Sequence, residues 1–331
     1  MNADALLTLA RSFMPCRILL TAAEVDLFSR LADGPRTAAE VAAQLRADLR
    51  AVTILLDALA ALELIAKRDD RYSCPPEHAR LLAADSPHTV LPMIQHCASL
   101  WRRWTELTGV VRGDPAARAR AQAPRDDAGL AAFIGAMHVL GRGPAAEAVA
   151  LIDPGAARSL LDVGGGSGIY TQAFLEASPH LRGTLFDRPA VIELARARLE
   201  AAGLLDRVTL AAGDFDHDEL PGGHDLALLS AIIHQNSRAQ NVTLYGKVFR
   251  ALLPGGRVII RDHVMSPDRT QPSDGAVFAV NMLVGTVGGN VYTLAETAED
   301  LAAAGFVRVR CLRANAGMHC LVEAFRPGKA E

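Results

Sequence analysis

The sequence lacks the cysteine pattern that marks small secreted or zinc-binding proteins. Its 331 residues include only five cysteines, at positions 16, 74, 97, 311 and 320, and no two of them form a CxxC pair. An odd number of scattered cysteines excludes a disulfide framework and gives no signal for zinc or another metal. We therefore expect a protein with no metal site in a reducing compartment.

An excess of one charge and long apolar runs are also missing. The net charge is only −3, so nothing favours binding to nucleic acid or to an anionic membrane. No uninterrupted apolar run approaches the roughly 18 residues of a membrane-spanning helix, and the first residues lack the pattern of a secretion signal. Half of the residues are apolar, which is enough to bury a large core. These observations predict a soluble, cytoplasmic protein.

The chain divides into two parts by pattern. Up to about residue 155 the sequence is rich in Ala and Leu with helical periodicity, whereas later short Val, Ile and Leu runs alternate with helical segments. Such alternation predicts βαβ units and a parallel sheet. We expect an N-terminal domain over 1–95, a helical linker and cap over 96–155, and an α/β domain over 156–331.

The first part contains a winged-helix pattern. Thr37 and Glu40 have capping-box spacing, a helix over 49–64 follows, and charged residues then separate two short strand-like segments. The helix has one apolar face, made of Val52, Leu55, Leu56, Leu59 and Leu62. A winged helix can bind DNA, but this helix carries one arginine against Asp57 and Glu63 and would repel phosphate. A packing or dimerisation module is therefore the favoured interpretation.

The strongest signal is a glycine-rich turn between a buried strand and a helix. In the stretch SLLDVGGGSGIYTQ, Asp162 precedes Gly164, Gly166 and Gly168. Glycine permits a sharp turn and lets the backbone approach a ligand, and the helix that follows offers free N–H groups. This stretch predicts a cofactor site at the end of the strand.

Acidic residues at the ends of the next two strands narrow the choice of cofactor. Asp187 ends GTLFD and suits a ribose diol, while Asp214 and Phe215 end RVTLAAGDF and suit an adenine ring. A dinucleotide fingerprint requires a third glycine where Ile169 stands, so that alternative fails. S-adenosylmethionine (SAM) has no pyrophosphate and does not need that loop. The order of these features favours SAM.

These motifs, with the later LLPGGRVII, resemble those of class I SAM-dependent methyltransferases. Over about residues 15–328 the chain is similar to the plant caffeate/isoflavone O-methyltransferases and their bacterial relatives. The resemblance implies a Rossmann-like, doubly wound seven-stranded sheet behind an all-helical winged-helix dimerisation domain. It also implies a homodimer, a small-molecule acceptor, and cofactor contacts from the residues above together with Ser230.

His234 ends the apolar run LLSAIIHQN. Taken alone, a histidine in such a place is structural more often than catalytic. Relatives carry their catalytic base a few residues after this strand, commonly as His-Asp-Trp, where this chain has His-Gln-Asn. The resemblance therefore implies that His234 is the base that deprotonates an acceptor hydroxyl, with Asp262 holding its ring. Val291 stands where plant relatives carry a second acid, so the acceptor side is expected to be less polar.

Five further residues are candidates for the acceptor pocket by resemblance: Met137, His138, His263, Asn281 and Met282. Each has a structural alternative. The first two can pack a helix, His263 can point outward at a strand end, Asn281 can bind backbone as a buried amide, and Met282 can fill the core.

The leading hypothesis is O-methylation of a small hydroxylated molecule. Methylation of sulfur, nitrogen or carbon is an alternative, because a thiol needs less help from a base. A SAM-binding relative that decarboxylates or hydroxylates its substrate and a SAM-sensing DNA-binding regulator are further alternatives.

Overall fold

The computed structural model describes residues 1–328, which form two compact units. The N-terminal unit contains residues 1–102 and 125–139, and the C-terminal unit contains residues 103–124 and those from 140 onward. Two segments between residues 96 and 155 thus belong to different units, which pattern alone did not indicate. The domain boundaries near 95 and 155 remain predictions.

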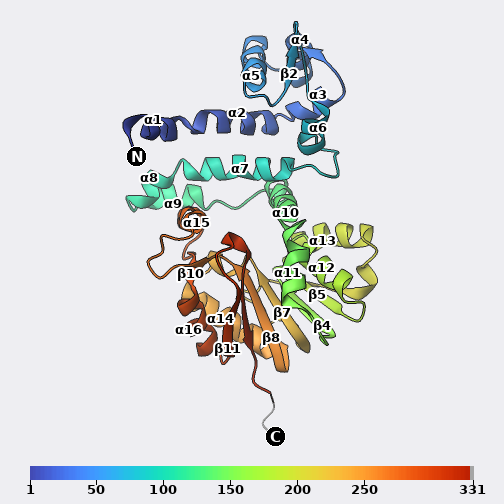
Figure 1. Ribbon diagram of the computed structural model, residues 1–331, viewed down its shortest axis with the longest axis vertical. Coiled ribbons are helices and arrows are strands. Elements are labelled where there is room, and N and C mark those ends of the chain that lie inside the picture. Colours follow the sequence, from blue (N-terminus) through green and yellow to red (C-terminus); the bar gives the residue numbers. More distant parts are fainter. Residues whose placement is uncertain (329–331) are drawn as a thin grey trace. The chain divides into compact units, whose positions relative to one another are not determined.

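The N-terminal unit is mainly helical, with a small antiparallel sheet (Figure 1). The sheet has the order β1-β3-β2 and does not fit an all-helical domain. The elements are α1 (Ala3–Arg11), α2 (Phe13–Glu24), α3 (Leu27–Ala32), β1 (Arg36–Thr37), α4 (Ala38–Leu45), α5 (Leu49–Ala61), β2 (Ala66–Arg68), β3 (Arg71–Ser73), α6 (Pro76–Leu82), most of α7 (Leu91–Trp104) and most of α10 (Asp127–Gly141).

The winged-helix pattern is present as predicted. Thr37 and Glu40 form a reciprocal capping box, and Val52, Leu56 and Leu59 of α5 are buried. The prediction for Leu62 is wrong: this residue lies just past the end of α5 and is exposed. Asp57 of α5 accepts hydrogen bonds within the unit from Lys67 Nζ (2.6 Å) and Tyr72 OH (2.7 Å). Its charge therefore stabilises the wing, which is the hairpin of β2 and β3.

The first two helices carry an apolar face that the described residues leave open. Leu6, Leu9, Phe13 and Met14 are about half exposed. Contrary to the expectation that no such segment exists, the stretch Ala3–Glu24 is long and apolar enough to span a bilayer by length and composition. Only a small part of it is buried within the chain.

The C-terminal unit is built on a seven-stranded sheet with the order β11-β12-β8-β7-β4-β5-β6. The five strands from β8 to β6 are parallel, and β12 runs antiparallel to both β8 and β11. The strands are β4 (Ser159–Val163), β5 (Arg182–Asp187), β6 (Val208–Ala212), β7 (His224–Ser230), β8 (Leu252–Asp262), β11 (Val307–Arg313) and β12 (Cys320–Phe325).

Helices cover both faces of this sheet (Figure 1). One face packs against α11 (Pro144–Ile152), α12 (Ile169–Ala177) and α13 (Pro189–Ala201), and the other against α14 (Arg238–Ala251) and α16 (Leu294–Ala303). The chain order reverses between β4 and β7, and open α/β sheets bind ligands at the carboxyl ends of strands at such a point. By this rule we expect the ligand crevice to lie at the glycine turn.

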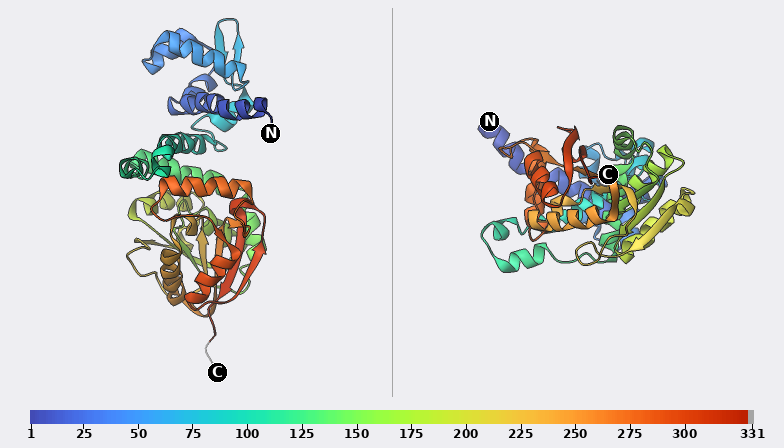
Figure 2. Two further views of the ribbon diagram at one scale, coloured as in Figure 1. Left: turned by 90° about the vertical axis from the view of Figure 1, so that its left-hand side faces the viewer. Right: turned by 90° about the horizontal axis from the view of Figure 1, so that it is seen from below.

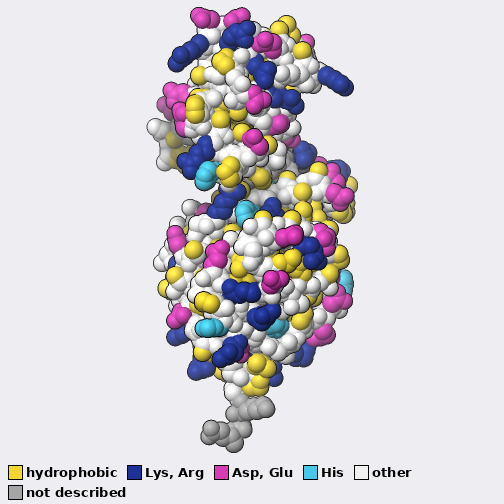
Figure 3. Space-filling view, turned by 90° about the vertical axis from the view of Figure 1, so that its right-hand side faces the viewer, with side chains coloured by type: hydrophobic (Ala, Val, Ile, Leu, Met, Phe, Trp, Pro, Cys, Tyr) yellow, Lys and Arg dark blue, Asp and Glu magenta, His cyan; other side chains and the backbone are white. Residues whose placement is uncertain are grey.

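The remaining elements of the C-terminal unit include α8 (Leu107–Val111), α9 (Pro115–Ala121), α15 (Ser273–Gly285) and the short pair β9 (Val264–Met265) and β10 (Tyr292–Thr293). Helix α15 lies across the end of the sheet where β8 terminates (Figure 2). On the face drawn in Figure 3, acidic and basic side chains of the described residues are interspersed.

A buried carboxylate joins the antiparallel strands at the sheet edge. Glu323 of β12 is fully buried and accepts hydrogen bonds from Arg257 of β8 (2.6 Å) and Arg310 of β11 (2.5 Å). Removing the partners of a buried charge is costly, because the charge cannot be solvated. Glu323 is therefore a structural group of this edge.

We expect Glu323→Ala to lower the free energy of unfolding by about 3–5 kcal/mol, because it leaves Arg257 without its buried partner. Arg310→Ala is the matched control and should cost less than about 1 kcal/mol, because the Arg310 side chain is 62% exposed. Urea unfolding measures both variants. Equal, small losses would contradict this account of the edge.

Candidate active site

The glycine turn brings the backbone close to the crevice. Gly164, Gly166 and Gly168 all have positive φ, at 67°, 57° and 79°, and α12 starts directly afterwards. A Cβ on Gly164 would lie 2.4 Å from Ile232 Cδ1, so no larger residue fits. The N–H of Gly166 donates to the carboxylate of Asp187 (2.9 Å), which fixes the turn against the end of β5.

Asp187 and Phe215 flank this turn. Burial raises the pKa of Asp187, against hydrogen bonds from the N–H groups of Gly166 and Arg188 that lower it. The Phe215 ring lies beside Gly164, since a Cβ built there would be 3.7 Å from the ring edge. Asp214, just before Phe215, caps its own loop by accepting from the N–H of Asp216 (2.9 Å). Side chains from the ends of β5 and β6 thus meet the turn.

Asp162 lies under the turn. It is 1% exposed and accepts a hydrogen bond from the hydroxyl of Thr171 (2.6 Å). Burial raises the pKa of this carboxyl to about 6. Asp162 therefore packs against the turn at Gly165. Its partner Thr171 is not part of the sequence motif.

His234 and Asp262 meet at the ends of β7 and β8. His234 Nδ1 lies 2.9 Å from both carboxylate oxygens of Asp262. Burial would raise the pKa of Asp262, but His234, the N–H of His263 and Arg261 together lower it. The carboxylate is ionised and can only accept, so Nδ1 carries the proton and Nε2 is left as a base.

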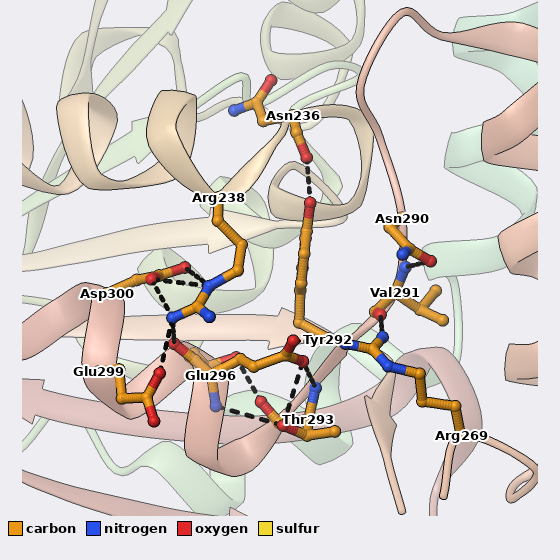
Figure 4. Close-up of polar contacts among 11 residues, drawn as sticks. Asn236, Arg238, Arg269, Asn290, Val291, Tyr292, Thr293, Glu296, Glu299 and Asp300 are labelled. Carbon is orange, nitrogen blue, oxygen red and sulfur yellow. Dashed lines mark hydrogen bonds and ion pairs between the residues drawn. The ribbon is translucent and has the colours of Figure 1, made fainter. Parts of the chain in front are cut away.

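The backbone around His234 is held from three sides. The N–H of Asn290 donates to the carbonyl of His234 (2.9 Å), and the Asn241 side chain donates to the carbonyl of Ile233 (3.0 Å). Tyr292 OH donates to the carbonyl of Asn236 (Figure 4). These bonds fix the short 3-10 turn that carries the histidine.

The two residues after His234 have different environments. Gln235 is exposed, whereas Asn236 is buried and donates to Asn241 Oδ1 (3.1 Å). Asn236 is therefore part of the support for this turn.

The stretch around Val291, where similar plant enzymes are expected to carry a second acid, is anchored by ion pairs. Val291 is buried, and its carbonyl accepts from Arg269 (2.8 Å), which also pairs with Glu296 of α16. Arg238 lies at the start of α14 and pairs with Asp300 (2.6 Å) and Glu299 (2.8 Å), which both lie on α16 (Figure 4). Because Val291 carries no carboxyl group, Asp262 is the carboxylate that contacts His234 among the described residues.

Aromatic groups border the histidines. The Phe278 ring of α15 meets His234 edge-on at 4.8 Å and His263 at 5.1 Å between ring centroids. The outward-facing alternative for His263 is wrong: it is 5% exposed, and its Nδ1 has no partner among the described residues. Burial lowers the pKa of His263, so its ring is held neutral at this end of β8.

The other predicted site residues have different surroundings. Asn281 accepts from the indole N–H of Trp104 (2.9 Å), so its partner is a side chain and the backbone alternative is wrong. Met282 is buried, and Ser230 accepts from Arg261 (2.7 Å). Met137 and His138 belong to α10 in the N-terminal unit and remain predictions.

The residues around the turn fit SAM by their chemistry. The backbone cradle at Gly164 would be filled by any Cβ, and the buried hydroxyls of Ser167 and Tyr170 have no partner among the described residues. Sequence motifs do not single out Ser167, Tyr170, Arg261 or Phe278. Their environments depend on packing between elements that are distant in the sequence.

Comparisons with known proteins agree with this geometry. The family model of the O-methyltransferase domain matches residues 124–307, and that of the O-methyltransferase dimerisation domain matches residues 7–83. The chain is 35% identical over 313 residues to 3-hydroxy-5-methyl-1-naphthoate 3-O-methyltransferase of Streptomyces sahachiroi, covering 92% of this chain and 90% of that protein.

A second relative and a solved structure point the same way. The chain is 30% identical to the tetracenomycin polyketide synthesis 8-O-methyl transferase TcmO of Streptomyces glaucescens, over 92% of this chain and 91% of that protein. The structure of PigF with SAH, from a Serratia species, superposes with a TM-score of 0.88 at 26% identity, over 98% and 100% of the two chains.

The pKa of Asp162 predicts a pH-dependent stability. A pKa raised to about 6 in the fold, against about 3.9 when unfolded, gives a stability contribution that is complete below the unfolded pKa and is lost as the pH rises through 6. Asp162→Asn cannot ionise. We expect the stability of this variant relative to wild type to rise by about 2 kcal/mol between about pH 4 and pH 7, measured by urea unfolding at each pH.

Asp268→Asn is the control for this measurement. Asp268 is exposed, and the hydroxyl of Ser266 and the N–H of Thr270 lower its pKa, so its removal should give no gain as the pH rises. A difference in the free energy of unfolding between Asp162→Asn and wild type that does not change with pH would contradict the raised pKa of Asp162.

Proposed function

The chain belongs to the O-methyltransferase family, and from that premise we propose that it methylates a phenolic hydroxyl of a ring-fused aromatic molecule, with His234 as the general base. It is a SAM-dependent O-methyltransferase of small molecules with a dimerisation domain. The observation that carries the proposal is the hydrogen bond between His234 Nδ1 and Asp262 at the carboxyl ends of β7 and β8.

The glycine turn, Asp187, Asp214 and Phe215 would hold SAM in the crevice. Bound SAM supplies a methyl group on a sulfonium, which is already activated for in-line displacement. The protein therefore contributes mainly position and proton transfer. The Gly164–Gly168 backbone would approach the amino-acid portion, Asp187 would accept from the ribose hydroxyls, and Phe215 would cover the adenine. Ser230 and Asp162 would support this arrangement.

His234 would take the proton of the acceptor hydroxyl. Its Nδ1–H donates to Asp262, so the free Nε2 would accept the proton that the acceptor hydroxyl loses when it is methylated. The products are a methyl ether, S-adenosylhomocysteine (SAH) and an imidazolium. The buried Asp262 carboxylate stabilises that imidazolium until its proton leaves to solvent.

Two observations support an aromatic acceptor. The Phe278 ring borders His234 and can pack against a flat ring system, and Val291 removes a charged group from the acceptor side. The printed names of two relatives specify a naphthoate and tetracenomycin, which also favours this class. His263, Asn281 and Met282 would line the acceptor side within this unit, and the roles of Met137 and His138 on α10 remain predictions.

The exposed face of α1 and α2 supports a homodimer through the N-terminal domain. Its half-exposed leucines, Phe13 and Met14 fall mostly within the residues that match the dimerisation domain, and a second copy of the chain would cover them. This occupant is preferred over a membrane because the match identifies a dimerisation module. Binding to nucleic acid is not expected, since Asp57 of the candidate recognition helix is committed to the wing.

His234→Ala should lower kcat for methyl transfer by about 10²- to 10⁴-fold, because the acceptor loses its base. Asp262→Asn should also lower kcat, since it weakens the orientation of the ring. SAH binding should change less than about threefold in both variants, because neither residue is proposed to contact the cofactor. Transfer of labelled methyl from SAM to a panel of hydroxynaphthoates, phenols, thiols and amines measures activity.

The exposed His180 provides the control, and His180→Ala should retain full activity. Wild-type turnover that survives His234→Ala would contradict the base. Products methylated on sulfur, nitrogen or carbon, or products that gain no methyl group, would contradict the proposed acceptor.

A further inference from the structure

Arg261 is a buried cation near the end of β8, and its three described hydrogen-bond partners are neutral. Its side chain donates to Ser230 Oγ (2.7 Å), to the carbonyl of Met318 (2.9 Å) and to His319 Nδ1 (3.2 Å). The residue is only 8% exposed. His319 accepts this bond, and burial together with Arg261 and Arg313 lowers its pKa, so it adds no charge of its own.

No carboxylate of the described residues forms an ion pair with Arg261. The buried Lys247 also lacks an ion pair, but its ammonium donates to two backbone carbonyls, whereas no described hydrogen bond involves Nη2 of Arg261. Arg261 acts to lower the pKa values of Asp162 and Asp262, but neither carboxylate contacts it, and the planar guanidinium is suited to binding a carboxylate directly. The unpaired state of Arg261 therefore indicates a place for an anion.

Tyr170 supplies a second, independent observation. Its ring stacks under the Arg261 guanidinium at 4.9 Å, and it is 7% exposed. Its hydroxyl lies near Ser230, which acts to lower its pKa, but makes no hydrogen bond of good geometry with the described residues. A buried hydroxyl is normally hydrogen-bonded, and this one can donate to an acceptor that also accepts from the guanidinium.

The position of the two residues suggests what that partner is. Tyr170 lies in the first turn of α12, two residues after Gly168, and Arg261 is paired in the sheet with Ser230, four residues before His234. The site thus lies between the glycine turn and the catalytic histidine. The first turn of α12 adds free N–H groups that favour an anion.

Building on the proposed function, we propose that Arg261 and Tyr170 form the carboxylate subsite for the amino-acid end of SAM. Arg261 would donate from Nη2 to one carboxylate oxygen, and Tyr170 OH would donate to the same carboxylate. The subsite binds a carboxylate next to the glycine turn. That carboxylate could belong to SAM or to a carboxylated acceptor, and the experiment distinguishes the two.

Calorimetric titration with two probes tests this subsite without any turnover. SAH carries the carboxylate, and decarboxylated SAH keeps the nucleoside, the thioether and the amine. Arg261→Met should raise the Kd for SAH about 10- to 100-fold and leave the Kd for decarboxylated SAH within about threefold of wild type. Tyr170→Phe should raise the Kd for SAH about 3- to 10-fold, and Arg261→Lys should restore part of the lost affinity.

Unchanged binding of decarboxylated SAH shows that each variant is folded. An equal loss of affinity for both probes would overturn the subsite and make Arg261 structural, and no loss for either would overturn it as well. A KM that rises only for a carboxylated acceptor, with SAH binding intact, would overturn the assignment to the cofactor. Failure of His234 as base leaves this result untouched, whereas wild-type protein that does not bind SAH would refute the proposed function itself.

Discussion

The contact between His234 Nδ1 and the Asp262 carboxylate is the constraint around which the C-terminal unit is arranged. It requires β7 and β8 to be neighbours and parallel, so that both strands end at the same edge of the sheet. It also requires a buried, ionised carboxylate, which is costly unless a donor is close. The histidine ring, the N–H of His263 and the nearby Arg261 offset that cost. The same interaction that stabilises a buried charge thus selects the tautomer of the histidine.

Most of the surrounding structure serves to hold this pair still. Asn290, Asn241 and Tyr292 fix the backbone on which His234 stands, and ion pairs from Arg269 and Arg238 anchor the stretch before α16. On the cofactor side, Asp162 and Asp187 brace the glycine turn from below and from the side. Polar groups in both regions are largely satisfied within the protein. The unsatisfied ones, on Tyr170, Ser167 and His263, lie in or beside the crevice.

The sequence allowed the sheet and the cofactor class to be predicted, because these depend on local signals at strand ends, whereas the His234–Asp262 pair was implied only by the resemblance to a family. Gly164 to Gly168, Asp187 and Asp214 follow buried runs in order, and parallel neighbours bring such ends together. Arg261 and Tyr170 could not be found in this way. Their importance depends on a buried guanidinium that no carboxylate contacts, and this arrangement forms only when β8, α12 and the Met318–His319 turn pack together. The burial of Asn236 and the pairing of Trp104 with Asn281 are also tertiary effects.

Acceptor acidity gives the most direct test of the account. A base accelerates transfer most when the acceptor hydroxyl is hard to ionise, so its contribution should shrink as the hydroxyl becomes more acidic. The measurement is kcat/KM for wild type and His234→Ala on one aromatic acceptor scaffold, with ring substituents that lower the hydroxyl pKa from about 10 to about 7. The account predicts that the ratio of wild type to variant falls steadily along this series. A ratio that stays constant would contradict His234 as the base.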